Sequence, residues 1–296
     1  MVCLHLNSRY CAHNASFKMK AIVTSILTIT ILISCSKEEP SSAMPIEESC
    51  LLTKVTSEFT SVAEHTIITT EYSYDPDDFL IRVNTTTEIN RPSSPSSLTE
   101  YISTYTYSNG MVSAAETSTT AYIQSTVWTN ENEKVKKVEG TLTWIGSDPI
   151  QLETTLYYGD DNMLDSLHRL TSNDFNMTQN YTFNSNKNFE SWDVYFNSEL
   201  NGHFVFSDYD NKNNPFKLLA KAIAQPQFHT TDGVTSDSYV SENNPGKIEV
   251  TGLNESTSTY TYEYNSTNYP TKIIRIDGKG VTTTTLLEYT SCTAKK

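Results

Sequence analysis

The chain has little positive charge. It has 296 residues, of which 21 are Lys or Arg and 35 are Asp or Glu, giving a formal net charge of −14. Nucleic acid and anionic membrane faces repel so acidic a surface, and we therefore expect no nucleic-acid partner. Charged residues make up only 19% of the chain, while Ser, Thr, Asn and Tyr occur in nearly every segment. This composition excludes a coiled coil and a polytopic membrane protein.

Sequence patterns of common catalytic and metal sites are also missing. No His-x-x-x-His, Cys-x-x-Cys, Gly-x-Ser-x-Gly or phosphate-loop pattern occurs, so we expect no catalytic residue, no metal and no cofactor. The segment 208–213 departs from an EF-hand loop, because Asn213 takes the glycine position and Leu219 takes the glutamate position. Turn chemistry explains this segment better. We therefore predict that the protein is not an enzyme.

The first 34 residues have the features of an export signal. Met19 and Lys20 give a basic start, and the fourteen residues Ala21–Ser34 are uncharged and largely apolar. Fourteen residues are too few to cross ~30 Å of hydrocarbon as a helix, so this segment is typical of a signal peptide rather than an anchor. We assign the signal peptide to residues 19–34. Residues 1–18 form a polar leader, and Met19 is a candidate start of translation.

Residues Leu32–Cys35 resemble the lipobox of bacterial lipoproteins. An aliphatic residue stands three positions before the cysteine, and a small residue stands directly before it. The resemblance implies that the Cys35 thiol receives a diacylglyceryl group and that acyl chains such as palmitate anchor the mature protein in a membrane. A plain secretory signal with a chance cysteine is the alternative.

Residues 35–49 comprise the lipidated cysteine and a flexible acidic tether. Positions 36–49 contain two Pro, four Ser and four Glu, which is typical of a solvated linker. The acidic run Ser36–Glu39 resembles the export signal of Bacteroidota surface lipoproteins. That resemblance implies an outer-membrane lipoprotein at the cell surface, and the periplasmic face is the alternative.

A repeated pattern fills residues 50–296. An alternating Tyr- and Thr-rich run meets a short Asn, Asp, Gly or Pro turn, and an apolar run follows. Alternation places side chains on opposite faces of a strand, and the turn residues tolerate positive φ, so each copy predicts a β-hairpin. About eight copies occur, at 72–81, 105–112, 127–135, 156–164, 181–189, 209–216, 239–248 and 262–274. We predict a single all-β domain, an antiparallel meander that curls or nearly closes into a barrel.

One segment, at about 215–225, predicts a short helix within this β domain. Asn214 can cap it, Pro215 suits its first turn, and Pro226 ends it. Phe216, Leu219, Ala220 and Ile223 share one face, and we expect this face to cover or plug the apolar side of the sheet.

The hairpins resemble known repeats. Tyr72-Ser73-Tyr74-Asp75 is similar to the YD repeat of Rhs proteins, but Gly-Arg-Leu does not follow the turn. The insert Tyr209–Phe216 and the closing Tyr-x-Tyr resemble small Bacteroidota lipoproteins of the DUF4595 type, a domain of unknown function, over roughly 50–296. The resemblance implies a surface lipoprotein and supplies no catalytic residues.

Two further modifications are predicted from short patterns. Cys50 and Cys292 bracket the domain in an exported chain, and we predict that they form a disulfide, which would make the first and last strands neighbours. Two buried, unpaired thiols are the alternative. Asp165-Ser166-Leu167 resembles a Bacteroidota O-glycosylation pattern, which makes Ser166 a candidate site; an ordinary strand-edge serine is the alternative.

Three functions remain open at this point. The first is a surface-exposed binding or interaction module with a glycan or protein ligand, served by exposed Tyr and Trp on a rigid sheet. The second is a periplasm-facing carrier or assembly factor with an apolar cavity. The third, a glycan-active enzyme, would need two carboxylates flanking one cleft, and the sequence cannot choose a pair among so many acids.

Overall fold

The computed structural model describes residues 48–61, 64–92, 94–217, 219, 241–252, 255–290 and 293–294, all within the unit Ile46–Lys296. The predicted leader, signal peptide and Cys35 lie outside these residues, as does the tether up to residue 47. In the part of the chain that is described, no helix is both long enough and apolar enough to cross a membrane.

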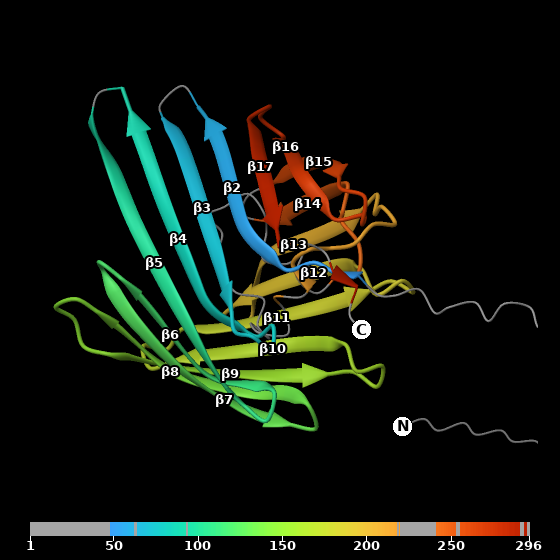
Figure 1. Cartoon of the computed structure of the whole chain (residues 1–296). Helices are drawn as coiled ribbons and strands as arrows, with labels where there is room; N and C mark the ends of the chain where they lie inside the picture. The colour runs from blue at the N-terminus through green and yellow to red at the C-terminus, as the bar shows by residue number, and fades with distance from the viewer. Residues whose placement is uncertain are drawn as a thin grey trace, which may run out of the picture. The chain divides into compact units, whose positions relative to one another are not determined.

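Sixteen antiparallel strands of the described region, β2 to β17, form a closed barrel (Figure 1). They are β2 (Leu52–Thr60), β3 (His65–Tyr74), β4 (Leu80–Arg91), β5 (Ser94–Ser108), β6 (Met111–Thr119), β7 (Tyr122–Glu131), β8 (Lys134–Trp144), β9 (Ile150–Tyr158), β10 (Leu164–Thr171), β11 (Asn176–Phe183), β12 (Phe189–Phe196), β13 (Glu199–Ser207), β14 (Lys247–Gly252), β15 (Ser256–Tyr264), β16 (Pro270–Asp277) and β17 (Thr282–Tyr289). Each strand pairs with its neighbours in sequence, and β17 pairs with β2. The predicted all-β meander is confirmed, and its closure is complete.

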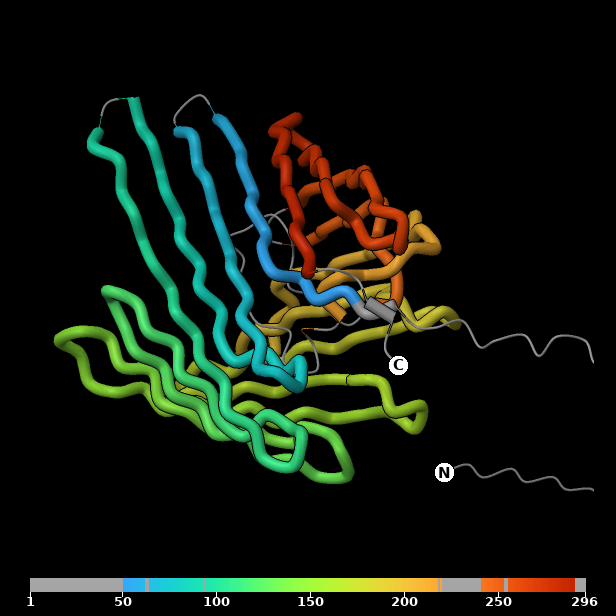
Figure 2. The backbone as a smooth tube through the Cα atoms, viewed as in Figure 1, coloured from blue at the N-terminus to red at the C-terminus, as the bar shows by residue number. Residues whose placement is uncertain are grey.

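The seam between β2 and β17 joins the two ends of the domain. Figure 2 shows the blue β2 beside the red β17, and their register pairs Thr285 with Ser57 and Leu287 with Val55. These four side chains are buried on the inner face of the barrel. Within the described barrel, closure pairs both edges of every strand from β2 to β17, which removes the edges on which an open meander could aggregate.

The inner face of the barrel holds the apolar core. Along β2, Val55 and Ser57 are buried, whereas the intervening Thr56 is only half-buried and Glu58 is exposed. The same alternation in other strands directs Tyr72, Trp128, Leu156, Tyr181, Trp192 and Ile273 into one hydrophobic cluster. Period-two alternation of this kind is what the Tyr- and Thr-rich runs predicted.

A single turn design recurs between the strands. In the β3–β4 turn, Asp75 Oδ1 accepts hydrogen bonds from the amides of Asp77 and Phe79, at 3.0 and 2.9 Å, and Asp78 has φ of 67°. Asn184, Asn265 and Asp277 accept the equivalent pairs of amides in later turns. A short polar side chain that accepts hydrogen bonds from amides two and four residues later stabilises the turn. This is why an Asp or Asn begins these four turns.

Tyrosine hydroxyls near the ends of several strands bond a backbone carbonyl at or near the start of the preceding strand. Tyr74 donates to the carbonyl of Leu52, Tyr107 to that of Leu80, and Tyr158 to that of Val135, over 2.7–2.9 Å. Tyr262 and Tyr289 make equivalent bonds, and in β7 the side-chain Nδ2 of Asn130 donates to the Val112 carbonyl instead. Burial raises the pKa of Tyr107 and of Tyr158 to about 12. The repeated tyrosine is therefore a structural latch.

The segment that connects β13 to β14 begins with the cap predicted for a helix. Asn214 Oδ1 accepts from the Phe216 amide at 3.0 Å, and the Leu219 amide bonds the Phe216 carbonyl. Phe216 and Leu219 are buried. Residues 220–225, which hold the rest of the predicted helix, lie outside the described residues.

Near both chain ends, a short strand pair stands outside the barrel. β1 (Glu48–Ser49) pairs with β18 (Thr293–Ala294), with Ser49 opposite Thr293. Cys50 is fully buried, and its Sγ lies 3.4 Å from Thr267 Oγ1. Cys292 lies outside the described residues, so the Cys50–Cys292 disulfide stays a prediction. Its expected consequence, neighbouring first and last strands, is confirmed by the β2–β17 seam.

Candidate functional site

The two ends of the barrel differ. One end, here called the tether end, carries β1, β18, the tyrosine latches and the β13–β14 connection. The other end, here called the rim, carries the hairpins β2–β3, β4–β5, β6–β7, β8–β9, β10–β11, β12–β13, β14–β15 and β16–β17. The rim is therefore the end of the barrel opposite to β1 and β18.

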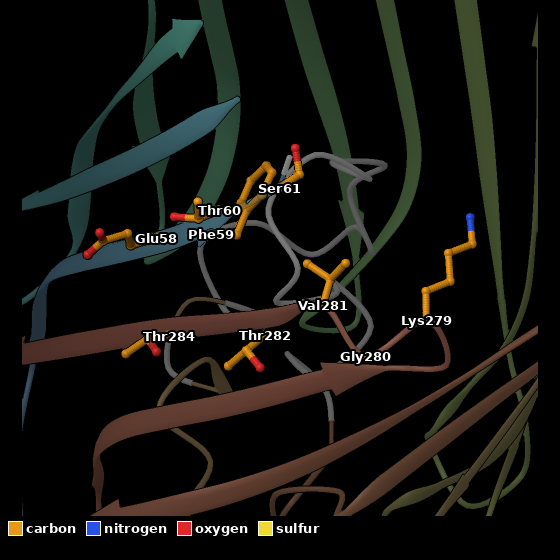
Figure 3. Close-up of a pocket in the computed structure, with 9 residues that line it drawn as sticks. All are labelled: Glu58, Phe59, Thr60, Ser61, Lys279, Gly280, Val281, Thr282 and Thr284. Carbon is orange, nitrogen blue, oxygen red and sulfur yellow. The ribbon is translucent and has the colours of Figure 1, made fainter. Parts of the chain in front are cut away.

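A groove opens at the rim, across the seam of the barrel (Figure 3). It has a volume of about 800 Å³, and nine residues line it: Glu58, Phe59, Thr60, Ser61, Lys279, Gly280, Val281, Thr282 and Thr284. They come from the end of β2, from the β16–β17 hairpin and from the start of β17. The groove therefore exists only because the first and last strands of the barrel pair.

The groove combines apolar and charged groups. Phe59 and Val281 supply apolar surface, and Glu58 Oε1 lies 2.8 Å from His65 Nε2. Asp277 fixes the β16–β17 hairpin through the amides of Lys279 and Val281, at 2.9 and 2.8 Å. A groove of this composition can hold a small polar ligand or a side chain of a partner.

Two arginines lie on inward-facing positions of the strands. Arg275 Nε donates to Ser258 Oγ on β15, and Arg169 Nε donates to Thr154 Oγ1 on β9, each at 3.1 Å. Burial lowers the pKa of Arg169 from its usual value. Each hydroxyl thereby fixes one edge of a guanidinium group within the barrel.

A second rim surface is apolar, and we call it the lip. It consists of Trp144, Ile145, Leu170, Phe175 and Leu200, which are 43%, 75%, 42%, 38% and 52% exposed. The Trp144 ring lies 4.9 Å from that of Tyr122, and the Phe175 ring lies 5.2 Å from that of Phe196. Single exposed apolar residues are ordinary, but a group of them on neighbouring hairpins indicates a contact surface.

The outward faces of the strands carry both charged and apolar side chains; Tyr157, Ile276 and Leu286, for example, are 51%, 45% and 50% exposed. Lys137 lies 2.9 Å from Glu139 and 3.1 Å from Glu153, and Lys272 lies 2.8 Å from Glu263. These side chains stay substantially exposed, and hydrogen bonds to Glu139 and Glu153 raise the pKa of Lys137.

The residues singled out by sequence do not meet in one place. Cys35 lies outside the described residues, and Cys50 lies at the tether end. Ser166 lies half-buried at a register shift in β10, between exposed Asp165 and fully buried Leu167. Its glycosylation stays a prediction. Among the described residues, no group of three or more His, Cys, Asp or Glu side chains could hold a metal.

Sequence reasoning missed both rim surfaces. The groove depends on strands more than 200 positions apart, so no local pattern marks it. The lip had one detectable sign, the adjacent Trp144 and Ile145 placed directly before a glycine at a turn.

Comparison with known proteins gives a likeness of fold. No protein-family description matches the chain, and no curated protein matches it. A porin-like protein from Bacteroides uniformis ATCC 8492 is similar, with a TM-score of 0.57 and 11% identity, over 81% of this chain and 98% of that one. A porin-like protein from Bacteroides vulgatus ATCC 8482 has a TM-score of 0.40 and 13% identity, over 82% of this chain and 100% of that one.

The shared property is the barrel. At 11% identity the likeness to the Bacteroides uniformis protein shows the fold alone, and it transfers no ligand and no activity to this chain.

Proposed function

We propose that this chain is an outer-membrane lipoprotein, anchored through Cys35 at the cell surface, whose barrel is a binding module for a protein or glycan. The observation that carries the proposal is the difference between the two ends of the barrel. The groove and the lip lie at the rim, and the chain enters at the opposite end. Ligand-binding surfaces are common at the mouths of β-barrels.

Charged side chains on the outward faces support attachment by a lipid rather than by the strands themselves. Ion pairs such as Lys137–Glu153 and Lys272–Glu263 would lose their hydration in hydrocarbon, at a cost of several kcal/mol for each ion. These ion pairs favour a barrel that is held at the membrane by an anchor, and the lipobox-like segment at Cys35 would supply one.

The tether has a suitable length. Thirteen residues lie between Cys35 and Ser49, and an extended chain of this length reaches roughly 45 Å. The barrel can therefore stand clear of the lipid headgroups. Attachment near β1 presents the tether end to the membrane and leaves the rim accessible to the surroundings.

Binding accounts for the rim better than catalysis does. The groove residue Glu58 is held by His65, and the described residues that line the groove include no second carboxylate. A glycosidase requires two carboxylates flanking one cleft. We accordingly propose a binding role with no catalytic residue. The resemblance to DUF4595-type lipoproteins of the Bacteroidota fits this role.

Protease shaving of intact cells tests the proposed location. A surface module loses its barrel to external protease, whereas a periplasm-facing carrier is spared until the outer membrane is opened. A periplasmic protein of the same cells serves as the control for membrane integrity. If this chain is protected from external protease as well as the periplasmic control is, the surface module is wrong and the periplasm-facing carrier is favoured.

A further inference from the structure

The residues of the lip lie on hairpins that belong to a row of four neighbouring hairpins joined by backbone hydrogen bonds. The Ile145 amide bonds the Ala121 carbonyl, the Ser172 amide bonds the Gln151 carbonyl, and the Asn197 amide bonds the Asn176 carbonyl. These bonds join hairpins β6–β7, β8–β9, β10–β11 and β12–β13 side by side. The exposed apolar side chains of the lip therefore lie along a connected part of the rim rather than on separate loops.

The rim ends of these four hairpins carry negative charge alone. Residues 117–124, 142–152, 170–177 and 195–202 contain no Lys, Arg or His. Their acidic residues are Asp148, Asp174 and Glu199, and all three are exposed. The lip thus combines uncovered apolar side chains with carboxylates that have no cation within these segments.

We propose that the lip binds a cationic amphipathic segment of a partner protein. Apolar side chains of the partner would cover Trp144, Ile145 and Leu200, and its Lys or Arg side chains would meet Asp148, Asp174 and Glu199. Opposite charges steer partners together and exclude like-charged competitors, such as acidic glycans and lipid phosphates. This inference rests on the proposed binding role and names its partner chemistry.

The test uses the full chain carrying Cys35→Ala, so that no lipid interferes with binding. The probes are a synthetic peptide of alternating Lys and Leu, its Glu and Leu counterpart, and the neutral sugar maltohexaose. Calorimetry measures affinity, and Trp fluorescence reports on the lip through Trp144. We expect the Lys peptide to bind and the Glu peptide not to bind.

Two lip variants and one matched control locate the binding surface. The first variant is Trp144→Ser with Ile145→Ser, and the second is Asp148→Lys with Asp174→Lys and Glu199→Lys. Each should weaken binding of the Lys peptide about tenfold or more, as expected for the centre of an interface. The control, Glu88→Lys with Leu98→Ser and Glu100→Lys, changes exposed residues of the same types on β4 and β5 and should leave affinity unchanged.

The outcomes separate this inference from the proposed function. Equal weakening in the control would mean general charge attraction and would overturn the inference, as would failure of the Lys peptide to bind. Binding of maltohexaose that is lost with Trp144→Ser would keep the binding module and replace its cationic partner by a glycan. If shaving shows the barrel at the cell surface but neither the Lys peptide nor maltohexaose binds, the inference is overturned and the proposed location still stands.

Discussion

Ser57 Oγ and Thr285 Oγ1 lie 2.9 Å apart in the interior of the barrel, although 228 positions separate them in the chain. Both residues are 2% exposed. This hydrogen bond crosses the seam between β2 and β17, where the first and last strands of the barrel meet. It is therefore a direct probe of closure.

Removing one partner of this bond should destabilise the fold. Thr285→Val keeps the side-chain shape and leaves the buried Ser57 hydroxyl without its partner, which costs about 1–3 kcal/mol. Ser57→Ala combined with Thr285→Val should cost less than the sum of the two single changes, because no orphaned hydroxyl remains. Urea unfolding of the four proteins measures the cycle, and strict additivity would show that the seam bond contributes nothing.

The tyrosine latch predicts a difference between two conservative substitutions. Tyr107→Phe removes the 2.7 Å bond to the Leu80 carbonyl inside the barrel and should cost about 1–3 kcal/mol of unfolding free energy. Tyr157→Phe, at an outward position that is 51% exposed, should change stability by no more than about 0.5 kcal/mol. Equal effects in thermal or urea unfolding would argue against the latch.

Alkaline pH should unfold the barrel through these phenols. Burial raises the pKa of Tyr107 and Tyr158 to about 12, above the unfolded value of about 10. Since the folded state holds these protons more tightly, their contribution is complete below about pH 10 and is lost as pH rises to about 12. Absorbance of phenolate, followed together with circular dichroism, should show late ionisation that coincides with loss of strand structure. The double variant Tyr107→Phe with Tyr158→Phe should show fewer late-ionising phenols than the unaltered protein.

Lipidation is tested at Cys35. Cys35→Ala removes the thiol that the lipobox presents, so acyl labelling should disappear and the protein should leave the membrane fraction. Cys50→Ala is the matched control and should keep both label and membrane association. A Cys35→Ala protein that stays labelled would refute the assignment.

The disulfide between Cys50 and Cys292 is tested by mass. Ser49 pairs with Thr293, so each cysteine is adjacent in sequence to a residue of a cross-strand pair. We expect no alkylation of these thiols in the denatured, unreduced protein, and two alkylated thiols after reduction. The bond should add roughly 2–5 kcal/mol of stability. Two reactive thiols before reduction would establish the alternative of unpaired cysteines.

Local physics made much of this protein predictable from its sequence. Asp75 and Asn265 begin turns because their side chains bond the amides that follow, and that interaction needs only a few adjacent residues. The alternation that buries Val55 and Ser57 and exposes Glu58 is likewise a property of a single strand. The acidic composition is also read directly from the chain, whereas the export signal stays a prediction.

The tertiary structure alone decided the closure and the rim. Thr284 lies opposite Glu58 only when sixteen strands complete the circle, and the groove follows from that pairing. The tyrosine hydroxyls were visible as a repeat, but their acceptors, such as the Leu80 carbonyl 27 positions before Tyr107, lie at the far end of the preceding strand in the chain. Similarly, Trp144, Phe175 and Leu200 form one lip because separate hairpins bond side by side. Sequence patterns report short-range preferences, whereas strand number and register depend on the sum of all pairings around the barrel.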